Sequence, residues 1–178
     1  MTGTFNLDAN SNIPDGNLAF LFRKLLSINL DPFMNLSPVM QIHSLLDNAL
    51  FIISQTNGSA TNYEEYGWFG GLVNLDPTQM YLLEMSESAT LIITGMPVDV
   101  EDTPITLMEG WNWISYLPQN SGDLGVALAS LGADANFVAS QSDGVSNNYA
   151  SSGGPWYGSL ETLEPGNGYL LEMLEDGY

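Results

Sequence analysis

The stretch "PWYGSLETLEPGNGYLLEM", residues 155–173, repeats in altered form the earlier stretch "GWFGGLVNLDPTQMYLLEM", residues 67–85. Upstream of it, a serine–glutamine pair and a loop that ends in tyrosine recur 86 residues apart, and an insertion at Gly153–Gly154 raises the offset to 88. Such a dense match, which preserves the order and a tryptophan, indicates a tandem repeat. The matched residues include Ser54 and Ser140, Gln55 and Gln141, Gly58 and Gly144, Asn62 and Asn148, Tyr63 and Tyr149, Trp68 and Trp156, Pro77 and Pro165, and the runs 81–85 and 169–173.

Each copy predicts the same order of elements. An aromatic strand (110–116 in the second copy) precedes an apolar segment with helical spacing, 124–132, whose first-copy counterpart is 39–50. Then come an "FIISQ" or "FVASQ" strand, a polar loop, a strand at the tryptophan, a turn and the "YLLEM" strand. In the second copy, Pro165–Gly166 suits the centre of a type II turn. First-copy residues 17–28 depart from the pattern and hold both basic residues, Arg23 and Lys24.

These elements predict a mainly β fold with a minor α+β character. We expect two tandem β-rich repeat units, each with one short helix. The first unit spans residues 1–95, an acidic linker spans 96–104, and the second unit spans 105–178.

The composition narrows the range of partners. Of the 178 residues, 44% are hydrophobic, which is enough for a core, while 21 acidic residues against two basic ones give a net charge of −19. Because such a surface repels phosphates and anionic lipids, we expect no nucleic-acid binding. The chain has no cysteine, and no apolar run approaches the roughly 18 residues of a membrane span. We therefore expect no membrane insertion. No signal peptide is evident at the N-terminus, so the chain is expected to be soluble or a fragment of a longer secreted protein.

The phrases "GWNWISYLP" (110–118), "ALASLGA" (127–133) and "WYGSLETLEPGNGYLLEM" (156–173) resemble a repeat family of secreted and surface-exposed proteins of marine and environmental bacteria. The resemblance covers 105–173 clearly and 36–95 less closely. It implies an extracellular or cell-surface location and a place in a longer array of repeats. The family has no established chemistry, so the resemblance implies no catalytic residue.

Four aromatic residues are candidates for ligand binding. Trp111 and Trp113 lie two apart in a predicted strand, so they share one face and could form a platform for sugar rings. The competing interpretation, which we favour for all four tryptophans, is that the indoles fill the core. Tyr63 and Tyr149 end polar loops and are better candidates for exposure.

A calcium ion is the one cofactor that the sequence suggests. Asp8, Asn10, Asn12 and Asp15 offer alternating oxygen ligands, although their spacing is not that of an EF-hand. A solvated turn is the commoner outcome for such a stretch. The same applies to the acidic residues of the linker.

Catalytic groups are sparse. The single histidine, His43, lies in an apolar segment, where histidine is more often filler than catalyst. Glu84 and Glu172 could in principle act as a carboxylate pair, but they occupy one position in two repeats and are better interpreted as solvent-facing strand residues.

The sequence thus favours a non-enzymatic extracellular repeat module with a structural or adhesive role in a larger surface or secreted protein. The alternative is a carbohydrate-binding module that uses exposed aromatic residues, and the third hypothesis is a fragment of a glycan-active enzyme. The expected partners are an extracellular glycan or neighbouring repeats of the parent chain.

Overall fold

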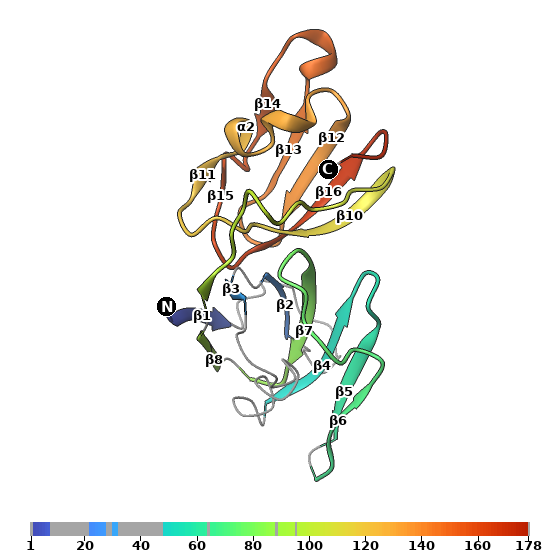
Figure 1. Ribbon diagram of the computed structural model, residues 1–178, viewed down its shortest axis with the longest axis vertical. Coiled ribbons are helices and arrows are strands. Elements are labelled where there is room, and N and C mark those ends of the chain that lie inside the picture. Colours follow the sequence, from blue (N-terminus) through green and yellow to red (C-terminus); the bar gives the residue numbers. More distant parts are fainter. Residues whose placement is uncertain are drawn as a thin grey trace, which may run out of the picture.

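The computed structural model (Figure 1) describes residues 2–7, 22–27, 30–31, 48–63, 65–87, 89–94 and 96–177, and for 2–7, 22–27, 30–31, 89–94 and 96 it describes the backbone alone. The described residues are mainly β, as predicted. The helical part comprises α2 (Leu124–Ala127) and two 3₁₀ turns at Ala129–Leu131 and Ala150–Ser152. The helix expected at 39–50 lies largely outside the described residues, and its last two residues belong to a strand.

The second unit forms one antiparallel five-stranded sheet in the order β10-β16-β12-β13-β14. Its strands are β10 (Gly110–Ser115), β16 (Gly168–Met173), β12 (Ala135–Ser140), β13 (Val145–Asn148) and β14 (Trp156–Gly158). The predicted "YLLEM" segment is therefore a central strand, paired on both sides. This position explains its nearly continuous apolar character.

The first unit forms a second five-stranded sheet in the equivalent order β2-β7-β4-β5-β6. Its strands are β2 (Phe22–Ser27), β7 (Met80–Met85), β4 (Ala49–Ser54), β5 (Ser59–Tyr63) and β6 (Gly67–Gly70). Even the irregularities agree. A register shift lies between Ala49 and Phe51 and again between Ala135 and Phe137, 86 residues later. The sequence repeat is thus also a repeat of backbone pairing.

The divergent segment at 17–28 still provides a strand. Phe22 pairs with Met85 and Ser27 with Met80, the register in which Gly110 pairs with Met173 and Ser115 with Gly168. The strand survives because its backbone pairs with β7, whatever side chains it carries.

Three two-stranded pairs complete the topology. β1 (Thr2–Leu7) pairs with β8 (Ala89–Thr94), β3 (Leu30–Asp31) with β9 (Met96–Pro97), and β11 (Gly122–Asp123) with β15 (Thr162–Leu163). The segment expected as a linker therefore begins with the strand β9.

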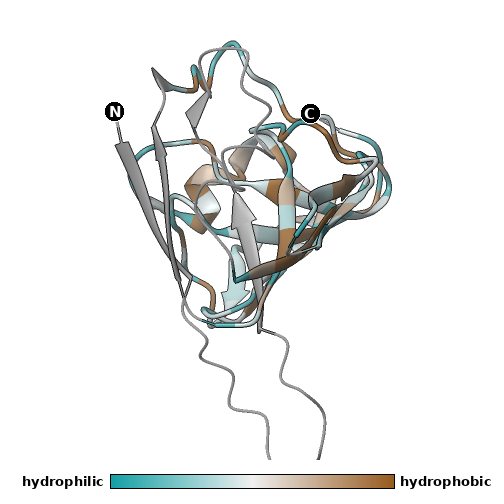
Figure 2. Ribbon diagram, turned by 90° about the horizontal axis from the view of Figure 1, so that it is seen from below, coloured by the Kyte–Doolittle hydropathy of each residue, from teal (hydrophilic) through white to brown (hydrophobic). Residues whose placement is uncertain are grey.

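Alternation along the strands puts one face of the second sheet against α2 and the loops. This core contains Ile114, Leu124, Leu128, Leu131, Ala135, Val138, Leu160, Leu163, Tyr169, Leu171 and Met173. The first sheet buries the equivalent residues, among them Ile52, Leu72, Leu75, Tyr81, Leu83 and Met85. Figure 2 shows strong hydrophobic colouring on strands and helical turns and paler or hydrophilic colouring on most connecting loops.

The hydroxyl of the buried tyrosine at the start of the central strand has the same kind of partner in both units. The Tyr169 hydroxyl accepts from Glu164 N at 2.7 Å, and the Tyr81 hydroxyl accepts from Asp76 N at 2.5 Å. These bonds hold the turn that precedes each central strand. In the second unit, Asn167 N donates to Glu164 O, and Gly166 has φ +82°, as expected for the third residue of a type II turn.

The two units meet through the first two strands in the order of each sheet, β2 and β7 in the first unit and β10 and β16 in the second. β10 contacts β7 and β2, and β16 contacts the same two strands. The contact of β10 with β7 has its counterpart in that of β16 with β2, as expected for units related by an approximate two-fold axis. Met80 packs against Gly168, which is the equivalent position in the other unit.

The first unit also covers the open edge of β10. The Gln55 Nε2 donates to Trp111 O at 2.6 Å, and the Gln55 Oε1 accepts from Trp113 N at 2.7 Å. Further along the edge, Ser115 Oγ donates to Pro77 O, and Gln79 forms an isolated bridge with Ile114. Backbone groups that would otherwise be open to edge-to-edge association are thus paired.

Replacing Tyr169 with Phe should destabilise the protein by about 1–3 kcal/mol, because Glu164 N loses its acceptor. Burial raises the pKa of Tyr169, and of Tyr81 and Tyr116, above the ordinary value of 10.0. Ionisation of these tyrosines therefore favours the unfolded state. The free energy of unfolding keeps its full value below about pH 10 and falls as the pH rises through the folded-state pKa values. Urea unfolding at neutral and alkaline pH measures both effects. In the Tyr169→Phe variant, the alkaline loss should be smaller.

Replacing Gly168 with Ala should cost about 1–3 kcal/mol, because the added Cβ would overlap the buried Met80 side chain. The double variant with Met80→Ala should lose less than the sum of the two single losses, because the shortened side chain makes room. Thermal or urea unfolding of the four proteins gives the coupling energy. Additive losses would contradict the contact between the two equivalent positions.

Candidate functional site

The outward face of the second sheet, opposite the core, carries a row of side chains that crosses all five strands. The register places them in line, one from each strand in the order of the sheet. We name this set the outward row: Trp111, Glu172, Phe137, Asn147 and Tyr157. Its end members are the most exposed aromatic residues of the row, Trp111 at 48% and Tyr157 at 61%.

The aromatic members take part in two edge-to-face pairs, the second of which includes Tyr149 from outside the row. Trp111 packs against Phe137 with ring centroids 5.8 Å apart, and Tyr157 packs against Tyr149 with centroids 5.6 Å apart. With a strand spacing of about 4.8 Å, the five-strand row is about 19 Å long. Each ring is braced by its partner and still presents apolar surface to solvent.

Hydrogen-bonding groups lie between the two pairs. Glu172 is half-buried, and its Oε2 accepts from Asn136 Nδ2 at 2.6 Å. Asn136 lies at the register shift of β12, where the extra residue turns its side chain outward. Asn147 is exposed on the neighbouring strand. The arrangement can therefore stack flat, partly apolar molecules and hydrogen-bond their polar edges.

The backbone that carries the indole of Trp111 is fixed from the first unit. Gln55 bonds both Trp111 O and Trp113 N along the outer edge of β10. Trp113, half-buried on the outward face, adjoins the row at the position opposite Leu170.

The first sheet has a similar series of residues at the equivalent register positions. Its register aligns Arg23, Glu84, Phe51, Thr61 and Phe69 across the five strands. We name this set the first-unit row. Tyr63 packs edge-to-face on Phe69 at 6.0 Å, as Tyr149 does on Tyr157. At the register position of Trp111 stands Arg23, for which only the backbone is described.

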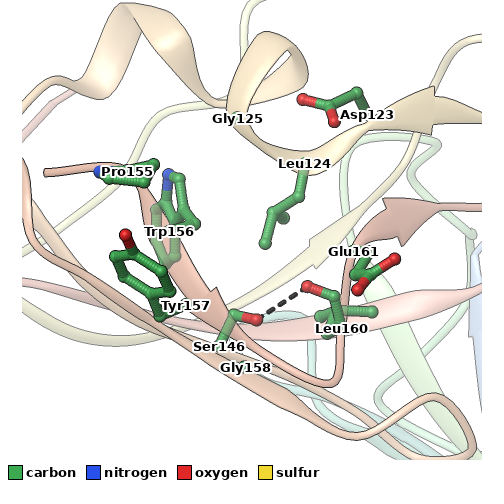
Figure 3. Close-up of a pocket in the computed structure, with 10 residues that line it drawn as sticks. All are labelled: Asp123, Leu124, Gly125, Ser146, Pro155, Trp156, Tyr157, Gly158, Leu160 and Glu161. Atoms are coloured by element: carbon green, nitrogen blue, oxygen red, sulfur yellow. Dashed lines mark hydrogen bonds between the residues drawn. The ribbon is translucent and has the colours of Figure 1, made fainter.

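A separate pocket of about 300 Å³ lies on the other side of β14, between that strand and α2 (Figure 3). In this view Trp156 and Tyr157 stand on one side, and the carboxylates of Asp123 and Glu161 lie across from them. Asp123 caps α2 by accepting from Val126 N at 3.0 Å, and Ser146 Oγ donates to Leu160 O at 2.7 Å. The pocket can hold a small polar molecule against the indole.

The structure corrects part of the tryptophan interpretation. Trp156 packs against the core as predicted. For Trp111 the core interpretation is wrong, because the buried face of β10 belongs to Asn112 and Ile114. Trp113 is half-buried on the same outward face as Trp111, so it too lies away from the core of its own sheet.

Tyr63 and Tyr149 are exposed as expected, at 54% and 47%. Sequence reasoning missed their ring partners Phe69 and Tyr157, and also Phe137. The signal was available in the alternation of the strands, since Tyr157 follows the core-facing Trp156 and must face outward.

The calcium-ligand candidates Asp8, Asn10, Asn12 and Asp15 lie outside the described residues, as does His43. Among the residues that the structure describes, no three His, Cys, Asp or Glu side chains gather in a way that could hold a metal ion. In the linker, Asp99 Oδ1 accepts from Glu101 N in a local turn.

Comparison with protein-family models, with curated proteins and with solved structures finds no match. In the described ranges, no helix has both the length and the apolarity needed to cross a bilayer.

Replacing Trp111 with Phe should remove most of the tryptophan emission that acrylamide quenches readily. Trp111 is 48% exposed, whereas Trp68, Trp113 and Trp156 are partly buried. Acrylamide is suitable because it is neutral, whereas the acidic surface would repel iodide. Stern–Volmer plots of both proteins measure the change. If Trp156→Phe had the larger effect, the assignment of the outward face would be wrong.

Proposed function

We propose that this chain is a non-enzymatic adhesion module, located outside the cell or at its surface, that holds a neutral glycan on the outward row of its second unit. The observation that carries the proposal is the alignment of exposed aromatic and hydrogen-bonding side chains across one open sheet face. The resemblance to repeats of secreted and surface proteins supports the location.

The chemistry of the row suits a sugar polymer. Aromatic rings accept the apolar faces of sugar rings, while Glu172 and Asn147 can exchange hydrogen bonds with hydroxyl groups. An open face about 19 Å long, rather than a closed cleft, fits a chain of several sugar rings. Trp111 and Tyr157, at the two ends of the row, would be the main anchors.

The net charge of the chain distinguishes between the two classes of ligand that commonly stack on aromatic side chains, glycans and nucleic acids. Aromatic platforms also bind single-stranded nucleic acids, but those proteins combine stacking with a positively charged groove. Here a net charge of −19 opposes any polyanion. A neutral glycan has no such penalty.

The presence of one carboxylate in the row supports binding more than hydrolysis. Most glycoside hydrolases use two carboxyl groups that flank the scissile bond. Glu172 is the single carboxylate of the outward row, and Asn136 already donates to it. The third hypothesis, an enzyme fragment, therefore has less support than binding.

A glycan array in calcium and again in chelator tests the proposal, followed by titration with the polysaccharides that bind. Trp111→Ala and Tyr157→Ala should each weaken binding by about tenfold or more, the usual effect of truncating an aromatic anchor. Tyr157→Phe keeps the ring and should retain most of the affinity. The matched control is Val100→Ala, an exposed linker residue away from the row.

Two outcomes would contradict the proposal. One is an array without any binding by protein whose folding circular dichroism has established. The other is binding that Trp111→Ala and Tyr157→Ala leave unchanged. The first outcome would favour the alternative in which the outward row contacts neighbouring repeats of the parent chain. Binding lost only in chelator would direct attention to the loop at residues 8–15.

A further inference from the structure

We infer that the chain binds two glycan strands at once, one on each unit, and thereby cross-links them. This inference rests on the glycan-binding function proposed above and adds a second site. That site consists of Glu84, Phe51, Thr61 and Phe69 of the first-unit row together with Tyr63.

The first observation is an aromatic pair that both copies present to solvent. Tyr63 and Phe69 pack at 6.0 Å with an interplanar angle of 67°, and Tyr149 and Tyr157 pack at 5.6 Å with an angle of 73°. All four side chains are 47–61% exposed. Because exposed rings add little to a core, packing within the unit does not explain why both copies keep them.

Other exposed positions near the aromatic pairs do not keep the same kind of residue in both copies. At three equivalent exposed positions nearby, the copies have diverged to unrelated residues. They are Gly71 and Ser159, Val73 and Glu161, and Asn74 and Thr162. Retention of the aromatic pair against this background indicates that the two pairs share a role at the surface.

The second observation is that the four row positions from the central strand outward have the same kinds of side chain in both units. From the central strand outward, the second unit has Glu172, Phe137, Asn147 and Tyr157, and the first has Glu84, Phe51, Thr61 and Phe69. Each series reads carboxylate, aromatic, short hydrogen-bonding residue, aromatic. The chemistry proposed for the second unit is therefore available in the first.

The two sites differ at one end. The first-unit row has Arg23 at the register position of Trp111, so it lacks the indole. We expect the first site to be the weaker of the two, since truncating an anchor of this size usually costs about tenfold or more in affinity.

The third observation is the placement of the two sites. The units meet through β2 and β7 on one side and β10 and β16 on the other. The β5–β6 and β13–β14 hairpins, which carry the aromatic pairs, therefore lie at opposite ends of the molecule (Figure 1). A short glycan cannot reach both ends, so two occupied sites hold two separate strands.

The experiment uses polysaccharide-coated beads together with isothermal titration of a short oligosaccharide, chosen from the glycans that the array identifies. Wild-type protein should bind two oligosaccharides per chain and aggregate the beads. The variant Tyr63→Ala/Phe69→Ala should bind one, with second-unit affinity within about twofold of wild type, and should not aggregate beads. The variant Tyr149→Ala/Tyr157→Ala should bind more weakly and also fail to aggregate them.

Controls separate the possible results. Val100→Ala should behave as wild type, and sedimentation must establish that each protein is monomeric, since dimers would aggregate beads with one site per chain. Because all four replaced residues are exposed, the melting temperatures should change little. Should a variant nevertheless unfold, the stoichiometry of the wild-type protein alone decides the matter.

One oligosaccharide per wild-type chain, with binding that Trp111→Ala weakens, would overturn the cross-linking inference and leave the proposed function intact. Bead aggregation by the monomeric Tyr63→Ala/Phe69→Ala variant at the wild-type level would also overturn it. A wild-type chain that binds no glycan would overturn the proposed function and, with it, this inference.

Discussion

The open edge of β10 is the constraint on which the rest of the structure depends. A strand at the end of a sheet leaves half of its backbone groups unpaired, and proteins must cover or blunt such an edge. Here the Gln55 side chain bonds Trp111 O and Trp113 N, and the turn at residues 77–79 covers the end of the strand. These groups belong to the other copy of the repeat. The duplication therefore completes the second sheet and is more than a second copy of a finished unit.

The same contact links the fold to the proposed site. Trp111 and Trp113 project from the strand whose outer edge Gln55 fixes, so the position of the indoles depends on the first unit. Ser54 and Gln55 recur as Ser140 and Gln141, which is expected when an approximate two-fold axis relates two units that share an interface. A serine–glutamine pair at the end of a strand carries no chemistry that would have suggested this role.

Much of the fold could be predicted from the sequence because the duplication supplies a second observation of each element. The strands at Trp68 and Trp156 and the "YLLEM" strands follow from local patterns that agree in both copies. The strand at Trp111 and Trp113, the short helix and the turn at Pro165–Gly166 follow from patterns in the second copy. The strand β2 could not be recognised in this way. Its residues, "FRKLLS", lack the repeat pattern, and its place is set by pairing with β7.

The sequence analysis predicted the wrong buried face for β10. Alternation puts Trp111 and Trp113 on one face but does not say which face is buried. Asn112 lies between them and is buried at 5% exposure, because its amide accepts from Met108 N and donates to Met108 O and Gly110 O. A buried asparagine that closes a local loop is compatible with the core, and the two indoles are then left for the outside. The candidate site thus depended on a hydrogen-bond pattern that spacing alone does not reveal.

The outer edges of the two sheets bear on whether the aromatic faces serve a ligand or a neighbouring repeat. With β2 and β10 facing each other across the approximate two-fold axis, a further repeat would have to approach β6 or β14. Both are short strands that end in glycine, Gly70 and Gly158. An added Cβ at either position would overlap the backbone of the adjacent strand. Such short, tightly packed edges are poor templates for another strand. Tyr63, Phe69, Tyr149 and Tyr157 stand beside these edges, so their exposed rings favour a ligand that stacks on side chains over a partner that extends the sheet.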